Sequence, residues 1–345
     1  MSAAAAEADA ARGTPPPLLK VEGLKTWFPI RTGVLQRVDR WIRAVDGVDL
    51  EIPQGKTLAL VGESGCGKTT VGRSILRLEQ PRAGRVLYDD TDLLALSRAA
   101  LRPYRQAMQI VFQDPTSSLD PRMPVRDAIA EGLRSFSIGA NTAERTERVA
   151  ELMTMVRLDP EHMWRYPHEF SGGQKQRICI ARALAVGPKL LICDESVSAL
   201  DVSIQAQILN LLRELQQRLR LTYLFITHDL GVVGHIADRV AVMYLGQIVE
   251  TGEVTEIFEE PKHPYTRALL GSVPRLDLER AGRLGGGAPG DPPDPANPPE
   301  GCRFHTRCPQ VFEPCADTPP ALREVQGRRC RCHLYDPAHM ARAEL

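Results

Sequence analysis

Residues Gly62 to Thr69 read Gly-Glu-Ser-Gly-Cys-Gly-Lys-Thr, which fits the pattern G-x-x-x-x-G-K-S/T at every fixed position. Glycines at this spacing let backbone N–H groups turn inward around phosphate oxygens. Lys68 can reach the β- and γ-phosphates, and Thr69 can offer its hydroxyl to Mg²⁺. The helix that begins here adds its positive N-terminal end. We therefore predict an ATP site made by Gly62, Ser64, Gly65, Cys66, Gly67, Lys68, Thr69 and Thr70.

A second chemical signal is the apolar run 190–193, which ends in the acids Asp194 and Glu195. The first carboxylate can hold a metal ion through water, and the second can polarise an attacking water. Two acids at a strand end are, taken alone, more often simply solvated. The phosphate loop in the same chain favours the catalytic interpretation.

Short apolar runs at 58–61, 190–193 and 223–226 fit buried strands. Strands alternating with helices predict an α/β fold with a mostly parallel sheet, whose ligands gather at the carboxyl ends of the strands. A helix is expected between the last two runs, because apolar residues recur there at helical spacing: Ile208, Leu211, Leu212, Leu215 and Leu219.

A further helical block, at about 114–187, predicts a helical insert in the α/β domain. Asn141 and Glu144 form a cap-like pair there. Apolar residues follow at helical spacing: Val149, Leu152, Met153 and Val156. The chain changes character after Leu284, where glycines and prolines predict a linker over 285–300 before a cysteine-rich tail, 301–345.

Composition excludes several classes of protein. Lys plus Arg equals Asp plus Glu, 43 each in 345 residues, so the chain lacks the basic field that a nucleic-acid surface needs. No stretch approaches the roughly 18 apolar residues of a membrane-spanning helix. The Ala-rich segment 1–17 does not have the pattern of a secretory signal and predicts a disordered tail. We therefore expect a cytosolic chain unless a partner holds it at a membrane.

The run 170–177, Phe-Ser-Gly-Gly-Gln-Lys-Gln-Arg, resembles the signature motif of ATP-binding cassette (ABC) proteins. Other elements of that family match in the correct order along the chain: Gln113 resembles its glutamine loop, Ser198 to Asp201 its dimer-contact loop, and His228 its switch histidine. Trp27, or alternatively Phe28, resembles its adenine-stacking aromatic. The resemblance covers Leu18 to about Pro274. It implies a P-loop NTPase cassette, 18–262, with a parallel core sheet, the helical subdomain insert and a small cysteine-rich C-terminal extension.

The resemblance also implies a mechanism. Two such subunits face each other head to tail, with ATP between them. The phosphate loop of one faces the signature of the other, which comprises Ser171, Gly172, Gly173 and Gln174. Glu195 would orient or deprotonate water, His228 would hold the γ-phosphate, and Gln113 would sense the metal. Mg²⁺ would be held by Thr69, Gln113 and Asp194, and Ser198 and Asp201 would contact the other subunit.

Two features narrow the transporter class. Residues 261–270 resemble the C-terminal segment of oligopeptide and dipeptide importer ATPases. We expect that segment to occupy residues 263–284. Residues 301–305 and 332–335 resemble their cysteine region. This implies peptide import at the cytoplasmic face of the membrane, with a second homologous ATPase as heterodimer partner, two permeases and, indirectly, an extracytoplasmic binding protein. The alternatives are an importer ATPase for nickel or another small solute, a soluble ABC ATPase, and an iron–sulfur regulatory protein that senses ATP.

The last set of residues is Cys302, Cys308, Cys315 and Cys332, with Cys330 close by. Thiols of a cytosolic chain stay reduced, so their crowding indicates metal before disulfide. Four thiolates can hold either zinc or an iron–sulfur cluster. The long gaps between the first three, and the importer resemblance, favour a 4Fe–4S cluster. Zinc and unligated thiols remain alternatives, and His305 and His333 are weaker candidates as ligands.

Overall fold

The structure is a computed structural model, and it describes residues 16–33, 36–198, 200–272 and 289–339. The chain divides into two compact units. Unit 1 comprises Met1–Leu19, Ile52–Thr57 and Ala95–Ile226, and unit 2 comprises Lys20–Glu51, Leu58–Leu94 and Thr227–Leu345. The expected tail, 1–17, falls almost wholly outside the described residues.

Unit 1 is built on three parallel strands, β6 (Met108–Val111), β7 (Leu190–Asp194) and β8 (Thr222–Thr227). All side chains of β7 and β8 are buried, as expected for strands covered on both faces. Asp194 lies beside Ile226 in the register, so the acidic end of β7 sits at the carboxyl edge of this sheet. The two strands expected at 190–193 and 223–226 are confirmed.

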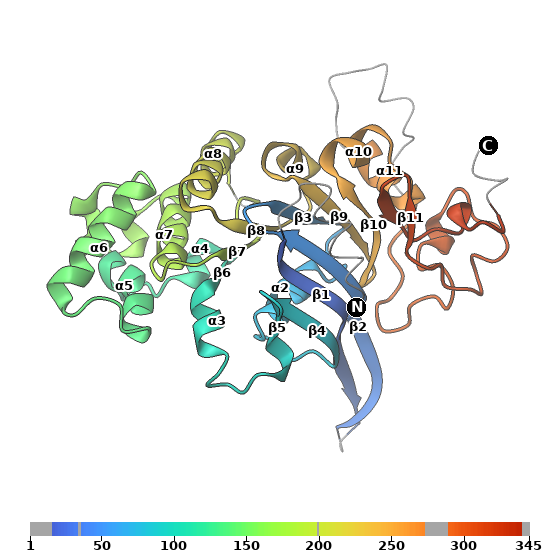
Figure 1. The fold of residues 1–345 in the computed structure, drawn as a ribbon, viewed down its shortest axis with the longest axis horizontal. Helices are drawn as coiled ribbons and strands as arrows, with labels where there is room; N and C mark the ends of the chain where they lie inside the picture. The colour runs from blue at the N-terminus through green and yellow to red at the C-terminus, as the bar shows by residue number, and fades with distance from the viewer. Residues whose placement is uncertain (1–15, 34–35, 199, 273–288, 340–345) are drawn as a thin grey trace. The chain divides into compact units, whose positions relative to one another are not determined.

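Helices of unit 1 follow the apolar spacing of the sequence. They are α3 (Arg102–Ala107), α4 (Pro115–Ser118), α5 (Val125–Ser135), α6 (Thr142–Met155), α7 (Gly172–Leu184) and α8 (Val202–Leu219), with 3₁₀ turns η2 (Pro160–Trp164) and η3 (Pro167–Glu169). α5, α6 and α7 pack on one another (Figure 1). The Asn141 side chain accepts the Glu144 N–H at 2.9 Å, which confirms the predicted cap. Leu219, expected on the buried stripe of α8, is instead exposed at the end of that helix.

Unit 2 holds two sheets. In one, β3 (Thr57–Val61) pairs in parallel with β9 (Arg239–Tyr244), and β10 (Gln247–Glu253) continues the sheet antiparallel to β9. The other sheet has the order β2-β1-β4-β5, from β1 (Pro17–Thr32), β2 (Arg37–Pro53), β4 (Ala83–Tyr88) and β5 (Thr91–Asp92). The remaining elements before the tail are α2 (Lys68–Ile75), η1 (Leu93–Ala95), α9 (Leu230–Ile236), α10 (Val254–Glu259) and α11 (Pro264–Gly271).

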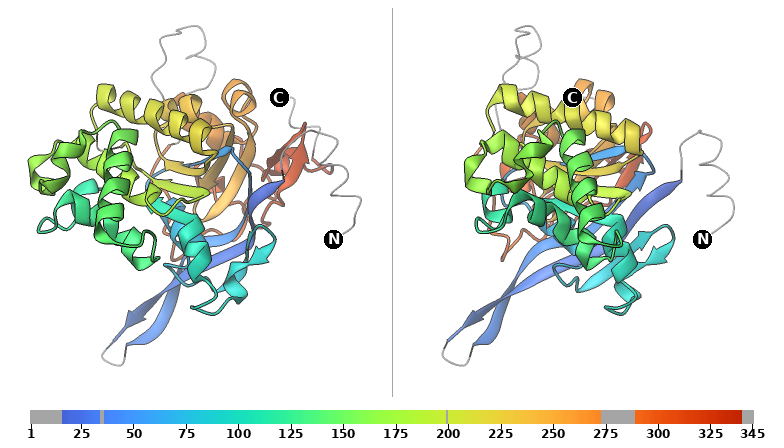
Figure 2. Two further views of the ribbon diagram at one scale, coloured as in Figure 1. Left: turned by 60° about the vertical axis from the view of Figure 1, so that its left-hand side comes forward. Right: turned by 90° about the vertical axis from the view of Figure 1, so that its left-hand side faces the viewer.

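The stretch between Trp27 and Val45 forms a long two-stranded ribbon. β1 and β2, at 16 and 17 residues, run side by side well past their neighbours (Figures 1 and 2). The outermost residues of β2, 37–40, are exposed, so this part of the ribbon lacks the apolar run that identifies a buried strand.

The cysteine-rich tail belongs to unit 2. It contains η4 (His305–Arg307), the hairpin β11 (Arg323–Val325) and β12 (Arg328–Cys330), and η5 (His333–Tyr335). β12 pairs antiparallel with β10, placing Cys330 opposite Glu250. The tail therefore extends the sheet that carries β3.

Candidate active site

The phosphate loop follows β3 and ends at the first residue of α2. Two of its glycines are required by close backbone approach. A Cβ on Gly62 would lie 2.2 Å from the carbonyl oxygen of Met243, and one on Gly67 would lie 2.0 Å from that of Ala44. Gly67 also has φ of 107°, which disfavours other residues. Ser64 and Gly65 are exposed at the loop tip, where a phosphate can approach.

Lys68 is buried within this loop. Its Nζ donates to the carbonyl oxygens of Gly62 and Glu63, each at 2.9 Å. The ammonium is thus held over the loop centre by backbone oxygens. Burial raises the pKa of the neighbouring Cys66 thiol, so Cys66 acts as a neutral packing group. Thr69 and Thr70 follow, half-buried, in the first turn of α2.

Trp27 lies on β1 and is half-buried. Its Nε1 donates to Asp46 Oδ1 at 3.2 Å, which fixes the plane of the ring. The guanidinium groups of Arg43 and Arg82 lie 5.1 and 4.9 Å from the ring centroid. The indole is therefore an oriented aromatic surface with cations at its face.

The two acids at the end of β7 have different surroundings. Asp194 is buried with 3% exposure, whereas Glu195 is half-exposed and adopts φ of 47°. A left-handed backbone is unusual for glutamate and turns its carboxylate away from the strand direction. Gln113, which follows β6, donates from Nε2 to Glu195 Oε2 at 2.8 Å. The structure thus brings these two predicted site residues into direct contact.

The signature residues begin α7. Ser171 is the N-cap: its Oγ accepts the Gln174 N–H at 3.4 Å, and Gln174 Oε1 accepts the Ser171 N–H at 2.9 Å. Ser171 and Gly172 are exposed. The 13-residue helix therefore presents its positive end to solvent, an arrangement suited to an anion.

The remaining predicted residues, Ser198, Asp201 and His228, lie in the segments that follow β7 and β8. Ser198 folds back on the catalytic candidate, since its Oγ donates to the Glu195 carbonyl at 2.9 Å. Asp201 is the exposed first residue before α8. His228 is exposed between β8 and α9, and the Asp229 side chain after it caps α9 by accepting the Gly231 N–H at 2.8 Å.

Four tail cysteines gather by packing and hydrogen bonding. The Cys302 N–H donates to the Cys315 carbonyl at 2.8 Å, and Cys308 lies one short turn further on. Cys332 joins them through Phe312, which packs against both groups of cysteines. Burial and the three neighbouring thiols raise the pKa of the Cys332 thiol to about 12. Burial and neighbouring thiols likewise raise the pKa of Cys302 to about 11.

Among the residues that the structure describes, no three His, Cys, Asp or Glu side chains come close enough together to hold a single metal ion. Among the helices of the described ranges, none combines the length and apolar character needed to cross a bilayer.

Sequence reasoning missed residues that support the phosphate loop. Glu63 occupies a variable position of the motif, yet the Arg307 guanidinium pairs with its carboxylate at 2.9 Å. Tyr265 accepts the Glu63 N–H at 2.9 Å. Asp46 joins Trp27 to Arg303. No local pattern marks these residues, because their partners are distant in sequence.

The two units together carry a phosphate loop, a strand ending in paired acids, and a capped glycine-rich helix start, which define a nucleotide-hydrolysing cassette. Residues 45–198 match the family model described as ABC transporter, and 249–315 match the model described as oligopeptide/dipeptide transporter, C-terminal region. The chain is 49% identical over 324 residues to the oligopeptide transport ATP-binding protein AppF of Bacillus subtilis, with 92% of this chain and 97% of that protein covered.

Solved structures agree. The post-hydrolysis dimer of the ATP-binding cassette MJ0796 bound to ADP and phosphate is 28% identical, with a TM-score of 0.61 over 68% of this chain and 98% of that one. The cbiO1 structure from Clostridium perfringens, part of an ABC transporter complex, is 29% identical, with a TM-score of 0.61 over 78% of this chain and 98% of that one. The chain belongs to the ABC transporter ATPases, in the group with the oligopeptide/dipeptide C-terminal region.

Proposed function

We propose that this chain is the ATP-binding and hydrolysing subunit that powers import of di- and oligopeptides through a membrane transporter. The observation that carries the proposal is its near-half identity, over almost its whole length, to an oligopeptide transport ATP-binding protein. The match of 249–315 to the oligopeptide/dipeptide C-terminal region supports the same substrate class and disfavours a soluble cassette or a nickel importer.

The catalytic roles follow from the chemistry of the residues. Glu195 is the group that orients and deprotonates the attacking water, and the Gln113 contact supports this by fixing its carboxylate. His228 holds the γ-phosphate. Mg²⁺ supplies charge neutralisation on the phosphates, with Thr69, Gln113 and Asp194 as its holders.

The signature residues act on a second subunit's nucleotide. The exposed N-terminus of α7, with Ser171 and the amides of Gly172 and Gly173, suits the γ-phosphate of ATP bound by a facing cassette. The assembly we propose has this chain paired with a homologous ATPase. Two permeases hold the pair at the cytoplasmic face of the membrane, and a binding protein delivers the peptide outside.

A transport assay in whole cells tests this function. Cells relying on this chain should accumulate a labelled tripeptide, and those carrying Lys68→Ala should not. A matched change at an exposed lysine, Lys189→Ala, should leave uptake near wild type. Equal peptide uptake with and without a working phosphate loop would refute the proposal, as would uptake of nickel but not of peptide.

We also propose that Cys302, Cys308, Cys315 and Cys332 hold a 4Fe–4S cluster. The gathering of these buried thiols supports it. A single zinc ion holds its sulfurs at about 2.3 Å, so a zinc site needs them tightly drawn together. A cluster of several iron and sulfur atoms accommodates a wider set of thiolates than a single zinc ion does.

Backbone N–H groups around these sulfurs support the same proposal. The Gln310 N–H donates to Cys308 Sγ at 3.4 Å. In the same way, the N–H of the residue two positions after the cysteine lowers the pKa of Cys302 (from Phe304) and of Cys332 (from Leu334), which opposes the effect of burial. Such donors stabilise thiolates and tune a cluster. His305 and His333 instead direct a ring nitrogen to the carbonyl oxygens of Cys302 and Thr318.

Metal content tests the cluster. Anaerobically purified chain should be brown and contain about four irons. Cys308→Ser should lose the iron, while Cys179→Ser, which changes a buried cysteine of α7, should keep it. A colourless protein with one zinc, or with neither metal, would refute the cluster without touching the ATPase proposal.

A further inference from the structure

Glu63 is an acid in the phosphate loop itself. It follows Gly62, and its own carbonyl oxygen accepts from the Lys68 ammonium at 2.9 Å. A triphosphate brings several negative charges to this loop, so an uncompensated carboxylate here would repel it. The loop therefore needs either to direct this side chain away or to neutralise it.

Arg307, from the C-terminal tail, provides the neutralising charge. Its Nη1 donates to Glu63 Oε2 at 2.9 Å, and its Nη2 donates to Glu63 Oε1 at 3.2 Å. This two-point pairing fixes the orientation of the carboxylate as well as its charge. The Arg307 side chain is 7% exposed and that of Glu63 is 27% exposed, so solvent screens the pair only in part.

The guanidinium is itself held in place. Its Nε donates to the Pro289 carbonyl at 3.0 Å, and its Nη1 also donates to the Tyr244 hydroxyl at 3.3 Å. It lies 5.8 Å from the Tyr244 ring centroid and 6.0 Å from that of Phe304. These contacts hold the Arg307 guanidinium in position beside the phosphate loop.

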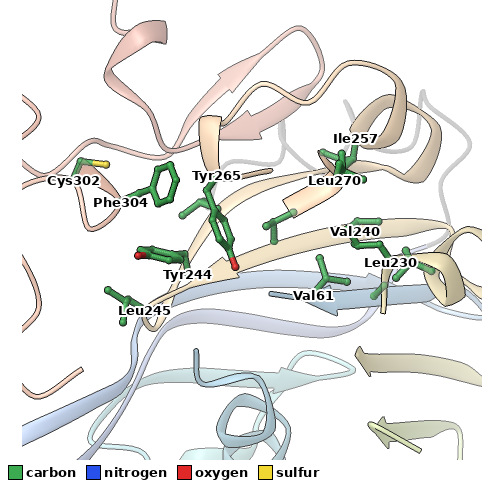
Figure 3. Close-up of a cluster of buried hydrophobic side chains, with 14 of the residues drawn as sticks. Val61, Leu230, Val240, Tyr244, Leu245, Ile257, Tyr265, Leu270, Cys302 and Phe304 are labelled. Atoms are coloured by element: carbon green, nitrogen blue, oxygen red, sulfur yellow. The ribbon is translucent and has the colours of Figure 1, made fainter. Parts of the chain in front are cut away.

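The same aromatic cluster holds the loop backbone. The Tyr265 hydroxyl accepts the Glu63 N–H, and its ring lies 4.6 Å from Tyr244 and 5.4 Å from Phe304, centroid to centroid. Figure 3 shows these three rings gathered beside the end of β9. Segment 292–295, which precedes the tail, and segment 63–66 of the loop also line one cavity of about 220 Å³, together with Tyr244 and Leu245.

We propose that Arg307 is a positioning residue for nucleotide binding, which neutralises Glu63 and holds the phosphate loop in its phosphate-accepting form. The proposal rests on the proposed function only in taking this loop as the ATP site, and it does not depend on the metal in the tail. It makes the folded state of the C-terminal extension a condition for full nucleotide affinity.

Nucleotide affinity of the full chain, measured by fluorescence titration with a labelled ATP and Mg²⁺, tests the proposal. Arg307→Gln removes the charge and should weaken binding at least about fivefold. Arg307→Lys keeps the charge and should recover most of that loss. The control Arg323→Gln breaks another ion pair of the tail, with Asp336, and should stay within about twofold of wild type.

Charge repulsion has a signature that a purely structural role lacks. The deficit of Arg307→Gln should shrink when salt rises from about 0.05 to 0.5 M, because screening weakens the repulsion between the carboxylate and the phosphates. Adding Glu63→Gln to Arg307→Gln should restore affinity. A deficit that is independent of salt, or a double variant no tighter than Arg307→Gln, would overturn the proposal.

Variants of the half-exposed Glu63 keep the proposal testable if Arg307→Gln does not fold. Glu63→Asp retains the charge but shortens its reach to Arg307, so it should bind nucleotide more weakly than Glu63→Gln. Equal affinity of the two would overturn the proposal. Failure of the wild-type chain to bind any nucleotide would instead refute the ATPase function, which separates the two results.

Discussion

The side-chain amide of Gln113 donates a 2.8 Å hydrogen bond to the carboxylate of Glu195. The two residues follow neighbouring positions of the unit 1 sheet, at the ends of β6 and β7. Gln113 thereby helps to fix the orientation of the Glu195 carboxylate. A change in the position of Gln113 would be felt directly at the group that we assign to water activation.

Replacing Glu195 by glutamine should leave MgATP binding intact and nearly abolish hydrolysis, because only the water-activating group is lost. Loss of a general base costs at least about 10²-fold. Turnover of purified complex and retention of ATP after gel filtration measure the two effects. Residual turnover above about a tenth of wild type would assign the base elsewhere.

Lys68→Ala should act earlier, at binding itself. The change removes a buried ammonium that contacts two loop carbonyls and that faces the phosphates. We expect nucleotide affinity to fall by at least about tenfold, read by titration. Lys189→Ala, at an exposed lysine before β7, is the matched control. Unchanged affinity in Lys68→Ala would move the ATP site to another part of the chain.

His263 should make stability sensitive to mild acid. It is fully buried as the N-cap of α11, where its Nδ1 accepts the Tyr265 N–H at 3.0 Å, and burial lowers its pKa to about 3. In the unfolded chain the His263 imidazole binds a proton near pH 6.5, whereas in the folded chain it stays neutral down to about pH 3. The free energy of unfolding therefore falls as pH falls from about 6.5 toward 3. Between pH 7.5 and 5.5 this amounts to about 1.4 kcal/mol.

The variant His263→Asn retains a capping oxygen and lacks this titration. The free energy of unfolding, from urea titrations at pH 7.5 and 5.5, should therefore fall less in the variant than in wild type by about 1.4 kcal/mol. The comparison between the two proteins cancels the contribution of Glu250, which both contain and whose pKa burial raises in the wild-type chain. Parallel pH dependence of the two proteins would mean that His263 can take up a proton when folded.

Local patterns predicted the parts of the site that depend on local chemistry. The loop 62–69 needs glycines and one lysine at fixed spacing, and the strand before Asp194 needs only apolar residues. Both can therefore be predicted from the sequence. The α6 cap is equally local, since Asn141 and Glu144 are three residues apart. The exposed Leu219 departs from the pattern because it falls at the last turn of α8, beyond the buried stripe.

Long-range relationships were not predictable in this way. Glu63 and Arg307 are 244 residues apart, and each alone is an ordinary charged residue. The outer part of β2, residues 37–40, is exposed and therefore carries no buried apolar stripe that would mark it as a strand. The cysteine-rich tail is likewise far along the chain from the phosphate loop, yet β12 pairs with β10 and Arg307, the residue before Cys308, contacts Glu63 of that loop.

The central claim is that ATP hydrolysis at this chain drives peptide import. The most direct measurement is ATP turnover by the transporter reconstituted in vesicles from this chain, its partner ATPase and the two permeases, with the binding protein added. We predict turnover that rises several-fold with a di- or oligopeptide and falls to near zero with Glu195→Gln in this chain. Turnover that is indifferent to peptide, or that persists in the variant, would contradict the account.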